Sequence, residues 1–190
     1  MNLNNNFEYI TQDIKNYARE FNRDPNKIKL IAVSKYASVQ QIIELYSKGQ
    51  REFAENTVQK AKIKQEELNK LGYTDIIWHF IAPVQSNKTR YVAHNFSWLH
   101  SLSRIKIAQR LDHQRSEINI LDYDNLDNAK NNKILDPLNV LIQVNIDHDL
   151  NKSGIDINNK QEILDLVQAI IELPNLKLRG LMCMPQNIPT

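Results

Sequence analysis

The sequence is poor in the residues on which several kinds of site depend. Among its 190 residues there is one cysteine, Cys183, which excludes an internal disulfide and a metal site built from cysteines. There are four glycines, and none belongs to a Gly-rich loop that would cradle a phosphate. The formal net charge is +2, which is too small to predict attraction to nucleic acid or to a membrane surface.

Long apolar runs are missing as well. No stretch approaches the ~18 apolar residues of a membrane-spanning helix. Residues 1–6 are polar and lack the apolar core of a signal peptide. The hydrophobic content of 42% and the charged content of 24% are ordinary for a globular protein. The sequence therefore predicts a cytoplasmic protein of one domain, residues 1–190, without nucleic-acid or membrane partners.

What the sequence does contain is an alternation of apolar strands, loops and amphipathic helices, repeated roughly every 20–35 residues, which is typical of βαβ units. Strands are predicted at residues 29–35, 51–54, 76–81, 96–100, 138–145 and 176–182. Helices are predicted at residues 6–21, 38–49, 57–71, 88–93, 103–111 and 159–172. Residues 116–136, rich in Asn, Asp and Lys, are predicted to be a flexible insertion. The fold class is α/β with a parallel sheet, and the pattern alone favours an open sheet over a closed (β/α)8 barrel, which needs eight strands and typically ~250 residues.

Polar residues follow the predicted strands, where ligands bind in parallel α/β folds. Lys35 ends an apolar run that predicts a strand buried on both faces. An amine beside a dry interior loses hydration, which lowers its pKa and makes it a candidate Schiff-base amine. The simpler interpretation, which this stretch alone favours, is an exposed lysine that closes a strand.

The other strand ends allow two interpretations each. Asn56 and Asn87 could cap helices or contact a ligand. His79 lies inside an apolar strand and is expected to be a buried histidine, either of the core or directly behind the site, and His100 is expected to be similar. Because the two lack carboxylates or cysteines at metal-ligand spacing, no metal site is predicted. The remaining polar residues at strand ends are Gln85, Ser86, Lys88, Asn145, Lys152 and Ser153.

Five segments of the sequence together resemble one family. They are Ile31-Ala32-Val33-Ser34-Lys35, Phe53-Ala54-Glu55-Asn56, Trp78-His79-Phe80-Ile81 followed by Gln85-Ser86-Asn87-Lys88, Gln143-Val144-Asn145-Ile146 with Lys152-Ser153-Gly154, and Leu178-Arg179-Gly180-Leu181-Met182. In order and spacing they resemble the pyridoxal phosphate homeostasis protein family, the YggS/PROSC group. The resemblance spans residues 7–185.

The resemblance implies a (β/α)8 TIM barrel of the alanine racemase type, incomplete here with about six parallel strands. It implies that Lys35 carries pyridoxal 5′-phosphate as a Schiff base and that Asn56 lies beside the cofactor, with Met182 as a candidate pocket wall. It implies a protein that binds and hands over the cofactor in vitamin B6 homeostasis, without catalytic turnover. Pyridoxal-phosphate-dependent apoenzymes are the candidate acceptors. Members are often monomeric, and self-association through an open barrel edge is the alternative.

The sequence departs from the family at two kinds of position. Ala54 and Ala82 stand where the family has glycine, which is tolerable if their φ angles are negative and mildly disruptive otherwise. The family's Met-Ser-x-Asp and Val-Arg-Ile-Gly-Thr segments, which include the phosphate cradle, have no counterpart in the sequence. We therefore expect weak cofactor binding, or binding only as an assembly, by a truncated or degenerate member.

Two alternatives to the carrier function stay open. The first is an inert remnant, or an interaction fragment, that binds no cofactor. The second is a pyridoxal-phosphate-dependent racemase or decarboxylase. Such an enzyme needs a second acid or base group opposite Lys35, for which the sequence offers no candidate.

Overall fold

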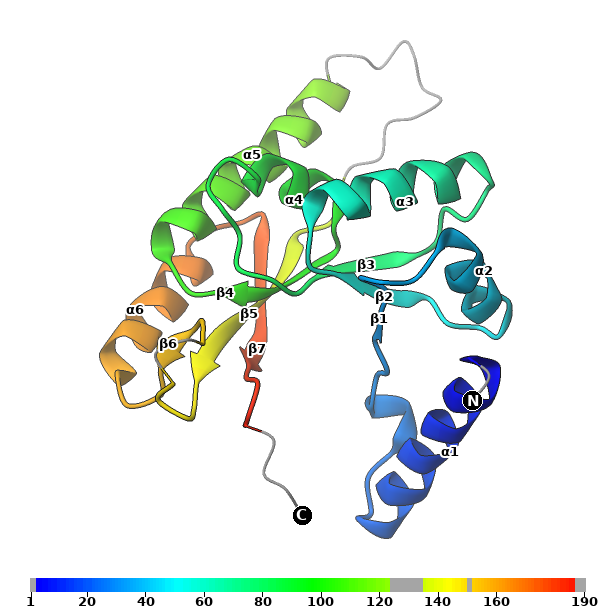
Figure 1. Cartoon of the computed structure of the whole chain (residues 1–190). Helices are drawn as coiled ribbons and strands as arrows, with labels where there is room; N and C mark the ends of the chain where they lie inside the picture. Colours follow the sequence, from blue (N-terminus) through cyan, green and yellow to red (C-terminus); the bar gives the residue numbers. More distant parts are fainter. Residues whose placement is uncertain (1–2, 124–134, 150–151, 187–190) are drawn as a thin grey trace. The chain divides into compact units, whose positions relative to one another are not determined.

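Strands alternate with helices along the chain (Figure 1). The structure is a computed structural model, and it describes residues 3–123, 135–149 and 152–186. The helical elements are α1 (Leu3–Glu20), η1 (Pro25–Lys27), α2 (Val39–Ser47), α3 (Val58–Lys70), α4 (Thr89–Asn95), α5 (Ile105–Tyr123) and α6 (Lys160–Ile171). The strands are β1 (Ala32–Val33), β2 (Glu52–Glu55), β3 (Ile77–Phe80), β4 (Trp98–Leu102), β5 (Leu138–Asn145), β6 (Ile155–Asp156) and β7 (Leu176–Met182). The pairs β1–β2, β3–β4, β4–β5, β5–β6 and β5–β7 are all parallel, which confirms the predicted alternation of parallel strands and helices.

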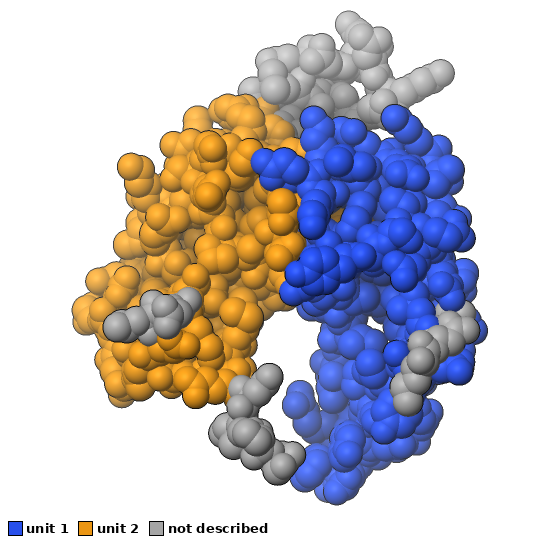
Figure 2. Space-filling model, in the orientation of Figure 1, with its two compact units in different colours: residues 1–55, 59–77 blue, residues 56–58, 78–190 orange. Residues whose placement is uncertain are grey.

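The chain divides into two compact units (Figure 2). Unit 1 comprises residues 1–55 and 59–77, and unit 2 comprises residues 56–58 and 78–190. The organisation of residues 1–190 as one domain stays a prediction. Among the described residues, no helix is both long and apolar enough to cross a membrane.

Unit 1 is built around the short β1–β2 pair. Ala32 lies opposite Phe53 in this pair, and Phe53 is fully buried. The helix α2 begins at the predicted cap, because the Ser38 hydroxyl accepts a hydrogen bond from the Gln41 backbone N–H at 3.2 Å. The Gln41 side chain accepts one in return from the Ser38 backbone N–H at 2.9 Å, so that both residues form a capping box. α1 packs against α2 and η1.

The first strand differs from the prediction. The structure assigns only Ala32–Val33 to β1, where the apolar run predicts a strand at residues 29–35 that is buried on both faces. Val33 is 53% exposed. The reason is that β1 is an edge strand: among the described residues it pairs with β2 alone. The prediction of a doubly buried strand is therefore wrong.

In unit 2, β5 lies between β4 and β7, and β6 pairs with its carboxyl end. The residues Leu138, Val140, Ile142 and Val144 alternate along β5 and are all buried. α5 packs against α4 and α6, and both α5 and α6 contact β7 (Figure 1). The predicted strands at residues 138–145 and 176–182 match β5 and β7 to the residue.

Helix α5 begins at Ile105 and continues to Tyr123, so the predicted helix at residues 103–111 is wrong at both ends. The inward face of the helix continues past Leu111 through Arg115, which is buried although it is charged. Its guanidinium donates hydrogen bonds to the carbonyl oxygens of Ala93 at 2.5 Å, Phe96 at 3.0 Å and Asp136 at 2.9 Å. Burial lowers the pKa of Arg115 to about 10. Three carbonyl acceptors therefore stabilise a cation at a position where sequence patterning expects an apolar residue.

The insertion predicted at residues 116–136 falls only partly on described residues. Residues 116–123 belong to α5, whereas residues 124–134 lie outside the described ranges, so their flexibility stays a prediction. Two smaller differences concern strands. β4 ends at Leu102 rather than at His100, because Leu102 still pairs with Ile142. β6 has no predicted counterpart, since two residues are too few to show a strand pattern.

Candidate functional site

Lys35 lies two residues beyond the end of β1, at the carboxyl end of the strand, as the sequence predicts. It is partly buried, and its Nζ lies 5.2 Å from the centre of the Tyr36 ring. The Lys60 Nζ lies 5.6 Å from the centre of the same ring. Within the described part of the chain, no carboxylate or carbonyl oxygen is bonded to the Lys35 ammonium group. The amine is therefore available for another partner.

A polar network fixes the residue that precedes Lys35. The Ser34 hydroxyl donates a hydrogen bond to Glu55 Oε1 at 2.8 Å. The Lys64 ammonium, from α3, donates to the same Glu55 oxygen at 2.7 Å and to the Ser34 backbone carbonyl at 2.6 Å. Glu55 is the last residue of β2. One ion pair thus joins β2, α3 and the backbone immediately before Lys35.

This network is deeply buried. The side chain of Glu55 is 0% exposed and that of Lys64 is 12% exposed. The second carboxylate oxygen, Glu55 Oε2, is buried and has no hydrogen-bond partner among the described residues. No sequence pattern points to Lys64, and Glu55 stands out only as part of the segment Phe53-Ala54-Glu55-Asn56.

The other two predicted cofactor residues, Asn56 and Met182, belong to unit 2, whereas Lys35 belongs to unit 1. Asn56 follows β2 directly and is exposed, and its Oδ1 accepts a hydrogen bond from the Thr57 hydroxyl at 3.2 Å. Met182 is the last residue of β7 and lies opposite Gln143 in β5. All three residues thus lie at carboxyl ends of strands, and their role as cofactor-binding residues stays a prediction.

Polar side chains also gather at the carboxyl end of β5. Gln143 Nε2 donates to the Ser153 carbonyl at 2.9 Å, and Asn145 Nδ2 donates to the Asp149 carbonyl at 2.8 Å. Both side-chain oxygens are buried without a partner among the residues described. Lys152 pairs with Asp147 and donates to the Met184 carbonyl at 2.9 Å. The predicted segment at residues 152–154 therefore lies against the ends of β5 and β7.

Gly154 allows this segment to approach β5. Its φ is +118°, and a Cβ at this position would lie 2.9 Å from the carbonyl carbon of Val144 and 3.0 Å from the backbone N of Asn145. A side chain would therefore meet both backbone strain and a rigid neighbour. Elsewhere, Asn22 and His148 are the non-glycine residues with positive φ in the described ranges. The φ angles of Ala54 and Ala82 are thus not positive, and the condition set for these two departures from the family is met.

His79 and His100 form a buried pair in unit 2. His79 Nδ1 lies 2.8 Å from His100 Nε2, and the two residues are 1% and 9% exposed. The His79 ring also stacks on Trp98, with ring centroids 5.6 Å apart. Burial, together with the neighbouring His79, lowers the pKa of His100 to about 4. The prediction that both histidines are buried is confirmed.

The lowered pKa of His100 predicts a loss of stability in mild acid. The unfolded chain takes up a proton near the ordinary pKa of ~6.5, whereas the folded protein resists protonation until about pH 4, so a falling pH favours unfolding. We expect this residue to lower the free energy of unfolding by about 2 kcal/mol between pH 7 and pH 5. Urea denaturation at pH 7 and at pH 5 measures this difference in the free energy of unfolding.

Two variants isolate this contribution from other titrating groups. His100→Gln should show a weaker pH dependence than the wild type, whereas His113→Gln, at an exposed position on α5, should keep it. An equal pH dependence in the wild type and in His100→Gln would contradict the prediction.

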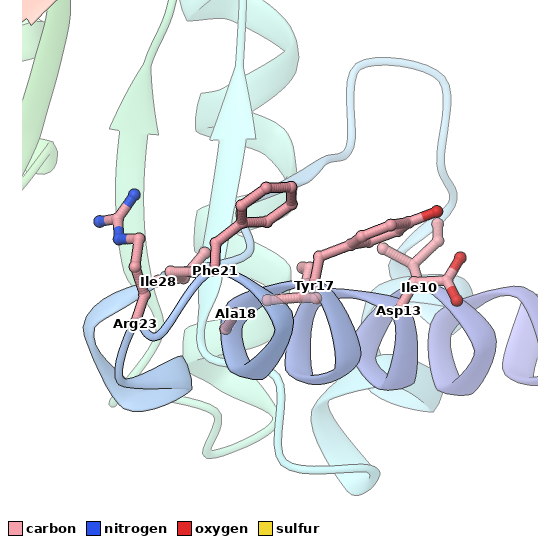
Figure 3. A pocket seen from close by; sticks show the side chains of 8 residues that line it. Ile10, Asp13, Tyr17, Ala18, Phe21, Arg23 and Ile28 are labelled. Carbon is pink, nitrogen blue, oxygen red and sulfur yellow. The ribbon is translucent and has the colours of Figure 1, made fainter.

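A hollow of about 430 Å³ lies along α1 in unit 1 (Figure 3). Its walls are mainly apolar and include Ile10, Tyr17, Phe21 and Ile28. The polar groups at its border are Asp13 and Arg23, and none of the predicted cofactor residues lines it. The strand ends, rather than this hollow, are therefore the candidate site.

Comparison with known proteins finds similarity over nearly the whole chain. The family described as "Alanine racemase, N-terminal domain" matches residues 10–188. A pyridoxal phosphate homeostasis protein of Vibrio alginolyticus is 41% identical over 188 residues, which cover 98% of this chain and 72% of that protein. A pyridoxal phosphate homeostasis protein of Haemophilus influenzae is 43% identical over 185 residues, which cover 97% and 70%.

The chain is also similar to a solved structure. PipY of Synechococcus elongatus PCC7942, with PLP bound, is 30% identical, with a TM-score of 0.70 over 93% of this chain and 72% of that one. The predicted fold of the alanine racemase type is thus confirmed.

Proposed function

The chain belongs to the family of pyridoxal phosphate homeostasis proteins, and from this membership we propose that it binds pyridoxal 5′-phosphate through Lys35 and serves vitamin B6 homeostasis. One observation carries the proposal. Lys35 lies at the carboxyl end of β1, and its amine forms no hydrogen bond to an oxygen of the described residues. The bound cofactor supplies an aldehyde, which condenses with a primary amine to a Schiff base and releases water.

The residues around Lys35 suit such a ligand. The ammonium groups of Lys35 and Lys60 both approach the Tyr36 ring, at 5.2 Å and 5.6 Å from its centre. Two positive charges near one ring favour an anionic ligand such as a phosphate ester. In this proposal Lys35 forms the covalent bond, Asn56 lies beside the cofactor, and Met182 forms part of the pocket wall.

We also propose that the protein holds and hands over the cofactor without catalytic turnover. A racemase or decarboxylase needs a second group that donates or accepts a proton at the substrate. The similar proteins of Vibrio alginolyticus and Haemophilus influenzae are named for pyridoxal phosphate homeostasis and not for such a reaction. Racemisation of an L-amino acid by the loaded protein would contradict this part of the proposal.

The test of the proposal is a titration with pyridoxal 5′-phosphate, followed by visible absorbance. We expect a saturable band of the lysine-bound cofactor in the wild type and none in Lys35→Ala. Lys62→Ala is a matched control, because Lys62 is an exposed lysine on α3. Borohydride reduction and mass spectrometry of the digested protein should then locate the cofactor on the peptide that contains Lys35.

Two outcomes would contradict the proposal. The first is a spectrum of free aldehyde with all three proteins, which would favour the inert remnant. The second is a band of equal strength in Lys35→Ala. The affinity from the same titration tests the weak binding that the sequence predicts. Transfer to apoenzymes, self-association and a cytoplasmic location stay predictions.

A further inference from the structure

We propose that the buried Glu55–Lys64 ion pair positions Lys35 for cofactor attachment, by holding the Ser34 backbone from which Lys35 extends. This inference rests on the function proposed above. It assigns Glu55 and Lys64 as positioning residues, since they act through Ser34 and not on the cofactor.

The polar groups of Ser34 are held at three points. Its backbone N–H donates to the Ala54 carbonyl at 2.8 Å. Its hydroxyl lies 3.1 Å from the Ala54 carbonyl oxygen and 2.8 Å from Glu55 Oε1. Its carbonyl accepts from the Lys64 ammonium at 2.6 Å and from the Ala37 backbone N–H at 2.8 Å. The orientation of the peptide that leads into Lys35 is therefore fixed.

The strand itself does not provide this rigidity. β1 contains only Ala32–Val33, and it is paired on one side among the described residues. Lys35 lies beyond its end, in a turn in which the Ala37 backbone N–H donates to the Ser34 carbonyl at 2.8 Å. Side chains from β2 and α3 add to this backbone bond, because Glu55 ends β2 and Lys64 reaches across from α3.

Stability alone does not explain an ion pair at this position. Two apolar residues of similar volume usually serve a buried position as well as an ion pair, because charges lose hydration on burial. The pair is also only partly satisfied, since Glu55 Oε2 has no hydrogen-bond partner among the described residues. What the pair provides, and an apolar pair could not, is a second and charged donor for the Ser34 carbonyl, beside the Ala37 backbone N–H.

A fixed Lys35 has a direct chemical consequence. In attachment, the neutral Lys35 amine would form a carbon–nitrogen double bond to the aldehyde carbon of the cofactor, the carbon–oxygen bond would break, and the oxygen would leave as water with the two hydrogens of the amine. The rate depends on how often the amine occupies the attacking position, and small displacements of a reacting group can reduce rates by up to about 100-fold. We expect loss of the Lys64 donor to the Ser34 carbonyl to slow attachment by about 10- to 100-fold.

The decisive variant is Glu55→Leu/Lys64→Met, which removes both charges together. Stopped-flow absorbance with pyridoxal 5′-phosphate gives its attachment rate, normalised to the folded fraction from circular dichroism. The matched control is Glu66→Leu/Lys62→Met, an exposed pair on the same helix with 3.7 Å between Lys62 Nζ and Glu66 Oε1. We expect slow attachment in the first variant and the wild-type rate in the second.

A conservative change separates positioning from general packing. Lys64→Arg keeps a cation that can donate to both Glu55 and the Ser34 carbonyl, and should attach the cofactor within about 3-fold of the wild-type rate. Ser34→Ala removes one of the three anchors and should attach several-fold more slowly. If the Glu55→Leu/Lys64→Met variant does not fold, the attachment rate of Ser34→Ala tests the inference instead.

The outcomes distinguish this inference from the proposed function. No attachment in the wild type would overturn the proposed function itself. Attachment in the wild type through Lys35, with an unchanged rate in the folded Glu55→Leu/Lys64→Met variant, would overturn the positioning role alone. An unchanged rate in Ser34→Ala would do the same where the double variant is unfolded.

Discussion

Lys64→Met lowers the free energy of unfolding by about 3–5 kcal/mol, the range expected when one partner of a buried ion pair is removed. The carboxylate of Glu55 is 0% exposed, and Lys64 supplies its cation at 2.7 Å. After the substitution the Glu55 carboxylate still accepts a hydrogen bond from the Ser34 hydroxyl. It no longer forms an ion pair with any of the described residues. Urea denaturation of the purified variant measures the loss.

Two further variants show whether the loss of stability comes from the buried ion pair. Lys62→Met removes a lysine that is 57% exposed and pairs with Glu66 on the helix surface, and should cost less than about 1 kcal/mol. Glu55→Leu/Lys64→Met should recover most of the stability, because no charge is then left buried without a partner. If Lys64→Met lowered the free energy of unfolding by no more than Lys62→Met does, the buried ion pair would contribute nothing measurable to stability.

Gly154→Ala is expected to lower the free energy of unfolding by about 3 kcal/mol, from backbone strain and crowding together. The residue has φ +118°, and its new methyl group would lie 2.9–3.0 Å from backbone atoms of β5. Backbone atoms cannot rotate away as a flexible side chain can. The segment that contains Lys152 and β6 should therefore separate from the end of β5, and amide hydrogen exchange should rise there.

Gly72→Ala is the matched control for this substitution. Gly72 also has a positive φ of +89°, but nothing lies within 4 Å of a Cβ built on it. Its cost should thus reflect backbone strain alone, about 1 kcal/mol. Equal costs at Gly154 and Gly72 would mean that the close approach to β5 contributes nothing.

The sequence predicts best where strand-forming residues follow a clear break. β5 and β7 are predicted to the residue, because each is rich in strand-forming apolar residues and begins directly after a turn-forming one, Pro137 or Asn175. β1 is the opposite case: its apolar run is present, but it cannot show that the strand lies at an edge and leaves Val33 exposed. The end of α5 is missed because Arg115 occupies a buried position, and only the folded chain brings its carbonyl acceptors together.

The candidate site is likewise predictable in part. Lys35, Asn56 and Met182 follow from the rule that ligands gather at the carboxyl ends of parallel strands, together with the family resemblance. Lys64 does not follow from either, since it lies 30 residues from Ser34 and on a helix that faces solvent along much of its length. One clue is nevertheless present: Glu55 ends the apolar strand Phe53-Ala54, and a carboxylate buried at that position requires a cation.

The hydrogen bonds of Arg115 have a consequence for how the chain tolerates changes of length. The guanidinium joins the Ala93 and Phe96 carbonyls to the carbonyl of Asp136, just before β5 begins. The start of β5 is thereby held to α4 and α5 by hydrogen bonds that involve none of residues 124–134. A change in the number of residues between the end of α5 and the start of β5 should therefore leave the register of the sheet unchanged.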